Sequence, residues 1–390
     1  MEQILKHNVS VSQLLQYIPE EEFASLIKET GVDYSVKKVF GKNLFYLLLY
    51  GLLETTRVSN RSLEDVFKSN KFKLLFNLAE QKNFKYNTIS TRLSKINCEF
   101  FERIYHSIYE IFSREFGEQT AIKYTITRVD SSMVCEAANK LAEGMTVGKK
   151  KDGKKQVKYT IGLTGLFPSS VEIFTQQAAL SEDITIPKVI LKNIDKKKDN
   201  VFVFDRGVSG RKNFDELNKN EFRFVTRINS NSKHVILKSQ DVPENLKIGN
   251  LDIISDETVY LYSKGRVMKT EFRLIKTKNE NNEPLWFVTN DFELSIEEVI
   301  HIYKLRWDIE VFFRFLKQEL NFSHFLSTNT NGIKVVLYMT LILAMLILVY
   351  KKYSDLGYKT AKRRFFYELE DMILEMAMIA SGGNPKLVFR

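Results

Sequence analysis

Hydrophobic residues recur at helical spacing through the first 120 residues of the chain. The segments VSQLLQYI, LFYLLLYGLL and EFFERIYHSIYEIF carry this period, and Pro19, Gly31 and Gly41 interrupt it. A stripe of apolar residues on a helix needs a core to cover it. The pattern therefore predicts an all-helical N-terminal region over residues 1–120.

The period changes from helix to strand near Lys123. KYTITRVDSSMV alternates and its apolar run ends at Asp130, while KYTIGLTGLF and SSVEIFTQQ have the composition of two further strands. VFVFDRG is a continuous apolar run, typical of a strand covered on both faces, and it ends at Asp205. Helical segments flank it in ITIPKVILKNI and RKNFDELNKN, and the strand EFRFVTRI follows. This order predicts an α/β protein with the first part of its core over residues 121–228.

Short strand patterns fill the next stretch, in HVILK, LDIIS, TVYLYS and EFRLIK, and they predict a mostly β insertion over residues 229–284. The core then resumes over residues 285–350 with the strand LWFVTND and a long helix, for which Ser295 and Glu298 form a capping box. Residues 351–390 are predicted to form a C-terminal helical tail. The uncharged run from Val335 to Tyr350 is shorter than a bilayer span, which favours a buried core helix over a membrane helix.

The helix YKLRWDIEVFFRFLK, residues 303–317, has an apolar face and a polar stripe. At roughly 100° per residue the stripe is about 80° wide, with Trp307 at its edge. Its members are Tyr303, Arg306, Glu310, Arg314 and Lys317. Charged residues four apart often do no more than solvate a helix, so this stripe is either an exposed face or a site.

Charge and cysteine content narrow the class of protein. The net charge of the 390-residue chain is +10, which favours polyanionic partners, nucleic acid first and an anionic membrane surface second. Cys98 and Cys135 are the only cysteines, which excludes a disulfide framework and a cysteine-rich zinc site and fits a reducing cytoplasm. The N-terminal residues lack the apolar core of a secretion signal.

Three carboxylates form the candidate catalytic site. Asp130 and Asp205 end apolar strands, and a carboxylate there is costly unless it is paired or binds a cation. Together with Glu310 they offer the oxygen ligands that Mg²⁺ or Mn²⁺ prefers. Two such ions could serve phosphodiester cleavage by activating the attacking oxygen and stabilising the leaving one. Each aspartate taken singly could instead close a strand-end turn or cap a helix.

Basic residues outside this helix are candidates for phosphate contact. The run GKKKDGKKQVKYT is predicted to form a hairpin tip, and Lys150, Lys151 and Lys154 within it would either contact DNA or be solvated. Arg92, in the predicted helix YNTISTRLSKI, would either lie against DNA or belong to an ordinary packing domain.

The residues described so far resemble the DDE transposases of bacterial insertion sequences. The spacing of Tyr303, Arg306, Glu310 and Lys317 resembles the Y-R-E-K signature of insertion sequence family four. The resemblance implies an RNase H-like core interrupted by the β insertion, with Asp130, Asp205 and Glu310 holding Mg²⁺ and the other three signature residues binding phosphates. Arg314 shares this stripe and is assigned the same role.

The resemblance also implies a function and partners. The expected protein is a transposase that acts on double-stranded DNA at the element's terminal inverted repeats and at target DNA. It would work as a homodimer on paired ends, in the bacterial cytoplasm with the nucleoid and without a membrane. Trp307 would stack on a displaced base or pack in the core. The alternatives are a DNA-binding repressor or inactive remnant of the same fold, and a nuclease that only hydrolyses.

Overall fold

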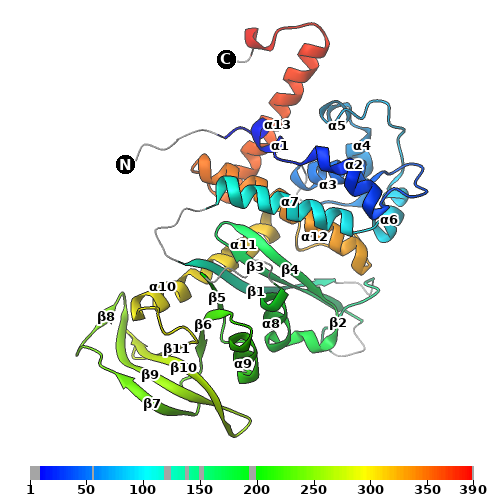
Figure 1. Ribbon diagram of the computed structural model, residues 1–390. Coiled ribbons are helices and arrows are strands. Elements are labelled where there is room, and N and C mark those ends of the chain that lie inside the picture. Colours follow the sequence, from blue (N-terminus) through cyan, green and yellow to red (C-terminus); the bar gives the residue numbers. More distant parts are fainter. Residues whose placement is uncertain are drawn as a thin grey trace.

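A mixed sheet runs through the protein (Figure 1). The computed structural model describes residues 9–54, 57–117, 124–136, 140–148, 153–192 and 199–388. Within them the sheet has 11 strands in the order β2-β3-β1-β5-β6-β11-β10-β9-β7, with β4 beside β3 and β8 beside β9. The strands are β1 (Thr125–Glu136), β2 (Met145–Thr146), β3 (Lys155–Thr164), β4 (Phe167–Phe174), β5 (Asn200–Phe204), β6 (Arg223–Ile228), β7 (His234–Gln240), β8 (Lys247–Ile248), β9 (Leu251–Ser263), β10 (Arg266–Asn279) and β11 (Pro284–Thr289).

The sheet joins an antiparallel part and a parallel part. β1 is antiparallel to β3 and parallel to β5, which is parallel to β6. From β6 onward the sheet continues through β11, β10, β9 and β7, all antiparallel to their neighbours. Every residue of β5 is buried, as its unbroken apolar run predicts. An α/β protein with a large mixed sheet is thereby confirmed.

Helices cover both faces of the central strands. Because side chains alternate along a strand, Phe202 and Phe204 pack with α8 (Glu182–Lys192) and α9 (Arg211–Lys219). Val201 and Val203 point the other way and pack with α10 (Ile296–Leu305). The sheet therefore has an α8–α9 face and an α10 face, and the end of β5 lies between them.

A layer of helices forms the other half of the molecule (Figure 1). It combines the N-terminal helices with the C-terminal helices in one hydrophobic core, and it confirms the predicted helical N-terminal region. Its helices are α1 (Val11–Leu15), α2 (Glu20–Thr30), α3 (Gly41–Glu54), α4 (Asn60–Lys68), α5 (Asn70–Leu75), α6 (Tyr86–Lys95), α7 (Glu99–Phe116), α12 (Thr330–Tyr353) and α13 (Tyr358–Ala380). The remaining elements that the structure describes are α11 (Trp307–Glu319) and the 3₁₀ helices Gln177–Leu180 and Pro385–Leu387.

The long apolar helix α12 is the centre of this layer. It packs against α3, α6, α7, α13 and strand β4. By length and composition it could cross a membrane, yet 89% of its most apolar window is buried inside the protein. A helix that is apolar all round belongs in a core, and the structure gives α12 that place.

Two predicted elements differ in detail. The stretches LDIIS and TVYLYS are not separate strands but belong to the single strand β9, which is 13 residues long. The predicted helix through residues 303–317 is interrupted at Arg306, where α10 ends and α11 begins. No proline or glycine marks the interruption, so the periodicity alone could not reveal it.

Candidate active site

Two aspartates lie side by side where β1 and β5 run parallel. Val129 of β1 is opposite Phe204 of β5, so Asp130 and Asp205 are the next residues along the two chains. Asp205 directly follows β5 as predicted, but the prediction that Asp130 ends its strand is wrong, because β1 continues to Glu136 through its pairing with β3. Neighbouring strands are about 4.8 Å apart, which brings both carboxyl groups to the same edge of the sheet. The structure thus brings together the two residues at which the predicted apolar runs end.

Asp130 has a carboxyl group whose pKa is raised to about 6. Burial is the largest cause, and the negative charges of Glu182 and Glu310 raise it further. The backbone N–H of Ser131 donates to Oδ1 at 2.8 Å, and this bond and the Arg306 cation partly offset the increase. Glu310 is therefore close enough to act on Asp130, as its place on the polar stripe predicts.

Asp205 opens the loop between β5 and α9. Its Oδ1 accepts a hydrogen bond from the backbone N–H of Arg206 at 2.7 Å, and the Tyr303 hydroxyl lies 3.5 Å from the same oxygen. Asp183, on α8, accepts from the N–H of Gly210 at 2.7 Å and so fixes the far end of the loop. The position of Asp205 is therefore set from α8 and from α10 together.

Arg306 lies at the junction of α10 and α11. Its N–H bonds the carbonyl of Tyr303 at 3.1 Å, and Ile309 bonds the carbonyl of Arg306 at 3.3 Å, so the chain is wound more tightly here than in an α-helix. The guanidinium pairs with Glu310 at 2.7 Å. Its Nε is buried and has no hydrogen-bond partner among the described residues. A buried, unused donor beside carboxylates is placed to bind an incoming oxygen, such as one from a phosphate.

The remaining stripe residues differ in exposure. Burial raises the pKa of the Tyr303 hydroxyl and lowers the pKa of the half-buried Lys317 ammonium. Arg314 is exposed on α11. Trp307 is 52% exposed, which excludes the core-packing alternative. An indole this exposed beside Arg306 is available to an aromatic or planar ligand.

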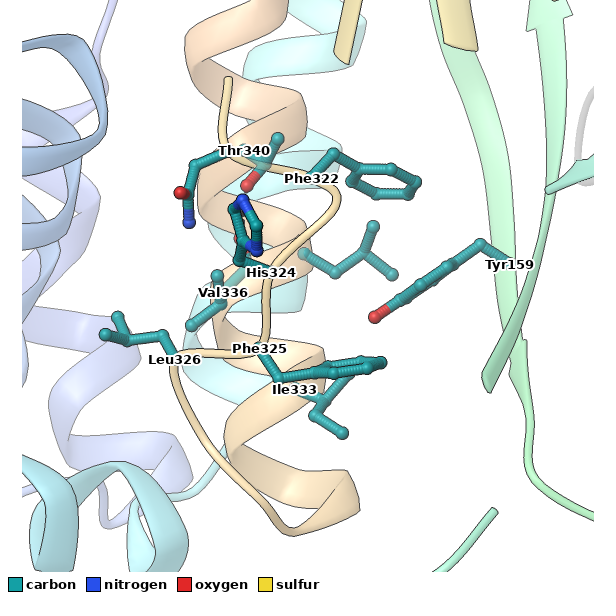
Figure 2. Close-up of a pocket in the computed structure, with 10 residues that line it drawn as sticks. Tyr159, Phe322, His324, Phe325, Leu326, Ile333, Val336 and Thr340 are labelled. Carbon is teal, nitrogen blue, oxygen red and sulfur yellow. Dashed lines mark hydrogen bonds between the residues drawn. The ribbon is translucent and has the colours of Figure 1, made fainter. Parts of the chain in front are cut away.

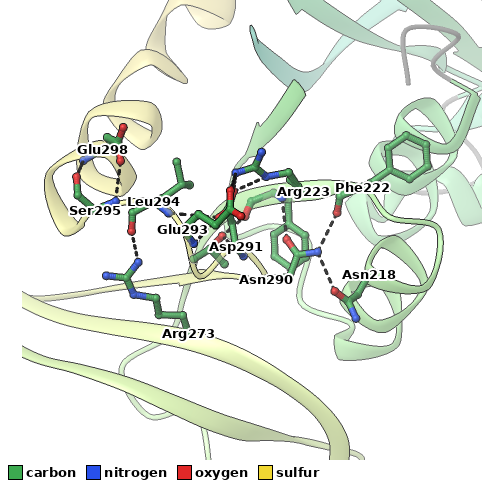
Figure 3. A network of polar contacts seen from close by, with 12 residues as sticks. Asn218, Phe222, Arg223, Arg273, Asn290, Asp291, Glu293, Leu294, Ser295 and Glu298 are labelled. Carbon is green, nitrogen blue, oxygen red and sulfur yellow. Dashed lines mark hydrogen bonds and ion pairs between the residues drawn. The ribbon is translucent and has the colours of Figure 1, made fainter. Parts of the chain in front are cut away.

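A polar network fixes where α10 begins (Figure 3). Asp291 is buried; it pairs with Arg223 of β6, and its Oδ1 accepts from the N–H groups of Glu293 at 2.9 Å and Leu294 at 3.3 Å. The predicted capping box follows directly and is confirmed, with the N–H of Glu298 donating to Ser295 Oγ at 3.1 Å. The network joins the sheet to the first turn of α10 and so directs the polar stripe toward the aspartates.

Glu182 is a fourth carboxylate that the sequence did not reveal. It begins α8 and accepts from the Ser131 hydroxyl at 2.8 Å and the Lys158 ammonium at 2.9 Å. The Lys158 side chain is 1% exposed and that of Glu182 is 28% exposed, so the lysine end of this ion pair is buried. A Cβ at Gly207 would lie 3.1 Å from the Glu182 side chain, so glycine lets the Asp205 loop approach α8. No local pattern distinguishes Glu182 from other acidic residues in a first helical turn.

Four basic residues outside α10 and α11 are predicted to contact DNA, and the structure describes two of them, Arg92 and Lys154. Arg92 donates to the carbonyls of Val39 at 2.8 Å and Val32 at 2.6 Å and pairs with Asp33 at 3.0 Å. These three acceptors lie inside the helical layer, and we therefore leave Arg92 out of the proposed DNA contacts. Lys154 is exposed beside β3. Lys150 and Lys151 lie outside the residues that the structure describes.

The loop after α11 closes over a small cavity between β3 and α12 (Figure 2). The Phe322 and Tyr159 rings pack with centroids 4.7 Å apart, and the Ser323 hydroxyl donates to the carbonyl of Lys317 at 3.3 Å. The cavity is about 20 Å³, which is room for one water molecule. We assign it to packing that holds the end of α11 and exclude it as a substrate site.

The side chains of Asp130 and Asp205 offer the type of ligand atom that a hard divalent cation prefers. These atoms are carboxylate oxygens, and the raised pKa of Asp130 shows that burial and negative neighbours act together on one group. A bound cation would relieve this unfavourable charge. Within the described residues, no three acidic, histidine or cysteine side chains stand at metal-ligand spacing. Glu310 is paired with Arg306 at 2.7 Å, so this pair would have to loosen for Glu310 to join the aspartates.

Comparison of the sequence with known proteins identifies the family to which the chain is similar. The sequence profile described as Transposase DDE domain matches residues 123–346. This range contains the two aspartates, Glu310 and the whole polar stripe. Among solved structures, the cryo-EM structure of the piggyBac transposase synaptic complex with hairpin DNA aligns over 96% of this chain and 82% of that chain, with TM-score 0.49 and 9% identity.

Three curated relatives carry the name transposase. The protein for insertion sequence element IS5377 of Geobacillus stearothermophilus is 24% identical over 342 residues, which are 88% of this chain and 85% of that protein. The y4zB protein of Sinorhizobium fredii is 28% identical over 145 residues, 36% of this chain and 40% of that protein. The protein for element IS4SA of Synechocystis is 31% identical over 150 residues, 38% of this chain and 40% of that protein. The latter two alignments thus span less than half of those relatives.

Proposed function

The chain belongs to the family of transposases that carry a DDE domain, and from this premise we propose that it cuts DNA at the ends of an insertion sequence and joins the freed 3′-hydroxyl ends to target DNA. The observation that carries the proposal is that Asp130 and Asp205 lie side by side where β1 and β5 run parallel, with Glu310 close enough to raise the pKa of Asp130. The neighbouring aspartates and the raised pKa of Asp130 support it, because closely placed carboxylates that burden one another with negative charge are favourable sites for divalent cations that cleave phosphodiesters.

The catalytic domain, in this proposal, is an RNase H-like core. The run β4-β3-β1-β5-β6 supports it, with antiparallel strands on one side of β1 and parallel strands on the other. Residues 229–284 would be the insertion, and they supply all four strands that extend the sheet beyond β11. The helical region 1–120 would bind the ends of the element.

Asp130, Asp205 and Glu310 would hold two Mg²⁺ ions, which Mn²⁺ could replace. Such ions supply an activated oxygen nucleophile and stabilise the leaving oxygen in phosphodiester cleavage. Arg306 holds Glu310 until DNA binds and then offers its guanidinium to a phosphate, for which the buried Nε is the supporting observation. Tyr303 keeps Asp205 in place through its hydroxyl.

The polar stripe would bind the transposon end near the cut. Lys317 and Arg314 would contact phosphates, and the exposed ring of Trp307 would stack on a base that leaves the duplex. Lys150, Lys151 and Lys154 would extend the phosphate contacts. The charge of +10 supports a polyanionic partner.

We place the working enzyme in the bacterial cytoplasm with the nucleoid, as a homodimer on paired ends and away from membranes. The buried surface of α12 supports a core role for that helix. The dimer follows from the need to process two ends of one element together, and sedimentation of the protein with and without end DNA would test it.

The deciding experiment is a cleavage assay on DNA that carries the terminal repeats flanking the gene, with Mg²⁺ or Mn²⁺. Metal-dependent cuts at the repeat ends, absent in Asp130→Ala and followed by joined products when target DNA is added, are the expected result. Specific binding without cuts by the wild type would favour a repressor or inactive remnant. Cuts without joined products would favour a nuclease that only hydrolyses.

A further inference from the structure

A basic groove lies between α9 and the tip of the β9–β10 hairpin, away from the catalytic edge. Its volume is about 650 Å³. Five cationic residues line it, and the acidic Asp215 is the one carboxylate among its lining residues. The cations are Lys212, Lys219, Lys264, Arg266 and Lys269, and all five are exposed.

The groove is built by an irregularity in β10. The pairing of β10 with β9 shifts between Val267 and Glu271, so the strand bulges toward α9. The Thr270 hydroxyl in this bulge donates to Asp215 of α9 and fixes the hairpin against the helix. Lys219 pairs with the same carboxylate at 2.9 Å. The negative charge in the groove is therefore already neutralised from within.

The other four cations have no acidic partner within ion-pair distance among the described residues. Lys212 and Lys269 come from the helix and the bulge, while Lys264 and Arg266 come from the hairpin tip. Like charges around one groove repel one another, and the arrangement becomes favourable when a polyanion lies between them.

The backbone conformation at the hairpin tip also supports a ligand in the groove. Lys264 and Gly265 both have positive φ, 49° and 79°, as in the two-residue turns that favour Asn-Gly or Asp-Gly. Lysine is disfavoured in this conformation relative to asparagine. A lysine here therefore costs some local stability, and a ligand for its ammonium group would account for its presence.

We propose that this groove binds the phosphate backbone of target DNA without reading its sequence. The proposal rests on the transposase function proposed above. The groove lies on the α8–α9 face of the sheet, whereas the stripe that would hold the transposon end begins on α10 at the opposite face. Four of its five cations are lysines, whose flexible point charges suit phosphate contacts that carry no sequence information.

The test compares two variants that lose four positive charges. The groove variant carries Lys212→Gln, Lys264→Asn, Arg266→Gln and Lys269→Gln. The control carries Lys352→Gln, Lys359→Gln, Arg363→Gln and Lys386→Gln, which change three exposed lysines and one exposed arginine near the C-terminus. Binding to a duplex without terminal repeats is measured against salt concentration. The slope of log K against log salt should become shallower by about 3.6 in the groove variant, because each of the four lost phosphate contacts contributes about 0.9.

Strand transfer then identifies the DNA. The groove variant should cut transposon ends as the wild type does and yet join them to target DNA at least tenfold more slowly. An equal loss in end cutting would overturn the target assignment, since the groove would then hold the element's own DNA. An unchanged salt slope, or the same loss in the control, would overturn DNA binding by the groove. The binding measurement needs no cleavage, so it still tests DNA binding by the groove if the wild type proves inactive.

Discussion

Asp130 is held where its carboxyl group binds a proton more readily than in water. The pKa is about 6 in the folded protein against 3.8 for the free group. The folded state therefore binds more protons than the unfolded state between these values, and stability falls as pH rises through them. Asp130→Asn should raise the free energy of unfolding by about 1–2 kcal/mol at pH 7.5, a discounted value for a partly exposed group. Urea unfolding at pH 7.5 and pH 3.5 measures this.

The gain should nearly vanish at the lower pH, where Asp130 is protonated in the folded state and mostly protonated in the unfolded state. Asp241→Asn is a matched control, because Asp241 is an exposed aspartate on the surface. A destabilised Asp130→Asn at pH 7.5 would show that the carboxylate is favourably paired in the metal-free protein, and the charge argument for cation binding would fail.

Metal ions should act on the same two aspartates. A cation at the sheet edge stabilises the folded state by mass action, about 1.4 kcal/mol at ten times its dissociation constant. Mg²⁺ should therefore raise the melting temperature of the wild type, and EDTA should reverse the increase. Asp130→Asn and Asp205→Asn should each lose most of the response while Asp241→Asn keeps it. Equal responses in all four proteins would point to non-specific ion binding.

The polar network at the start of α10 stabilises the position of that helix against the sheet. Asp291 is 4% exposed and joins Arg223 to the turn that begins the helix. Asp291→Asn removes the buried charge that faces this arginine, which typically costs about 3 kcal/mol. Urea unfolding should show a loss of about 2–4 kcal/mol, whereas Glu293→Gln should cost under about 0.5 kcal/mol because that side chain is 75% exposed. A neutral Asp291→Asn would mean that other bonds fix α10.

Some of these elements could be predicted from the sequence because their causes are local. The apolar run that ends at Asp205 predicts the end of β5, and the spacing from Tyr303 to Lys317 predicts one polar stripe. The run that ends at Asp130 does not mark a strand end, because pairing with the distant β3 carries β1 on to Glu136. The position of Glu182 could not be predicted, since it depends on how α8 packs against Ser131 and Lys158. Nor could the internal acceptors of Arg92, because they come from a loop that is distant in sequence. Local patterns do not encode such contacts.

At the scale of the whole molecule, the helical layer is made from both ends of the chain. α12 packs against α3 and α7, and α13 packs against α1, α3 and α5. The fragment 1–120 alone would leave the faces that receive α12 and α13 uncovered. It should therefore bind a hydrophobic dye and unfold without a cooperative transition. Co-expression with residues 327–388 should restore cooperativity, and a sharp transition by the fragment alone would contradict this.

The central position of α12 also determines when the helical layer can fold during translation. Roughly 240 residues separate the end of α7 from the end of α12, and a ribosome needs about 10–50 s to add them at 5–20 residues per second. For that time the N-terminal helices wait with apolar faces exposed, which makes nascent chains clients for chaperones. A ribosome that stops before residue 353 releases a protein whose helical layer lacks its centre. The helical layer can therefore fold only after α12 has been synthesised, and any activity that needs this layer must follow that step.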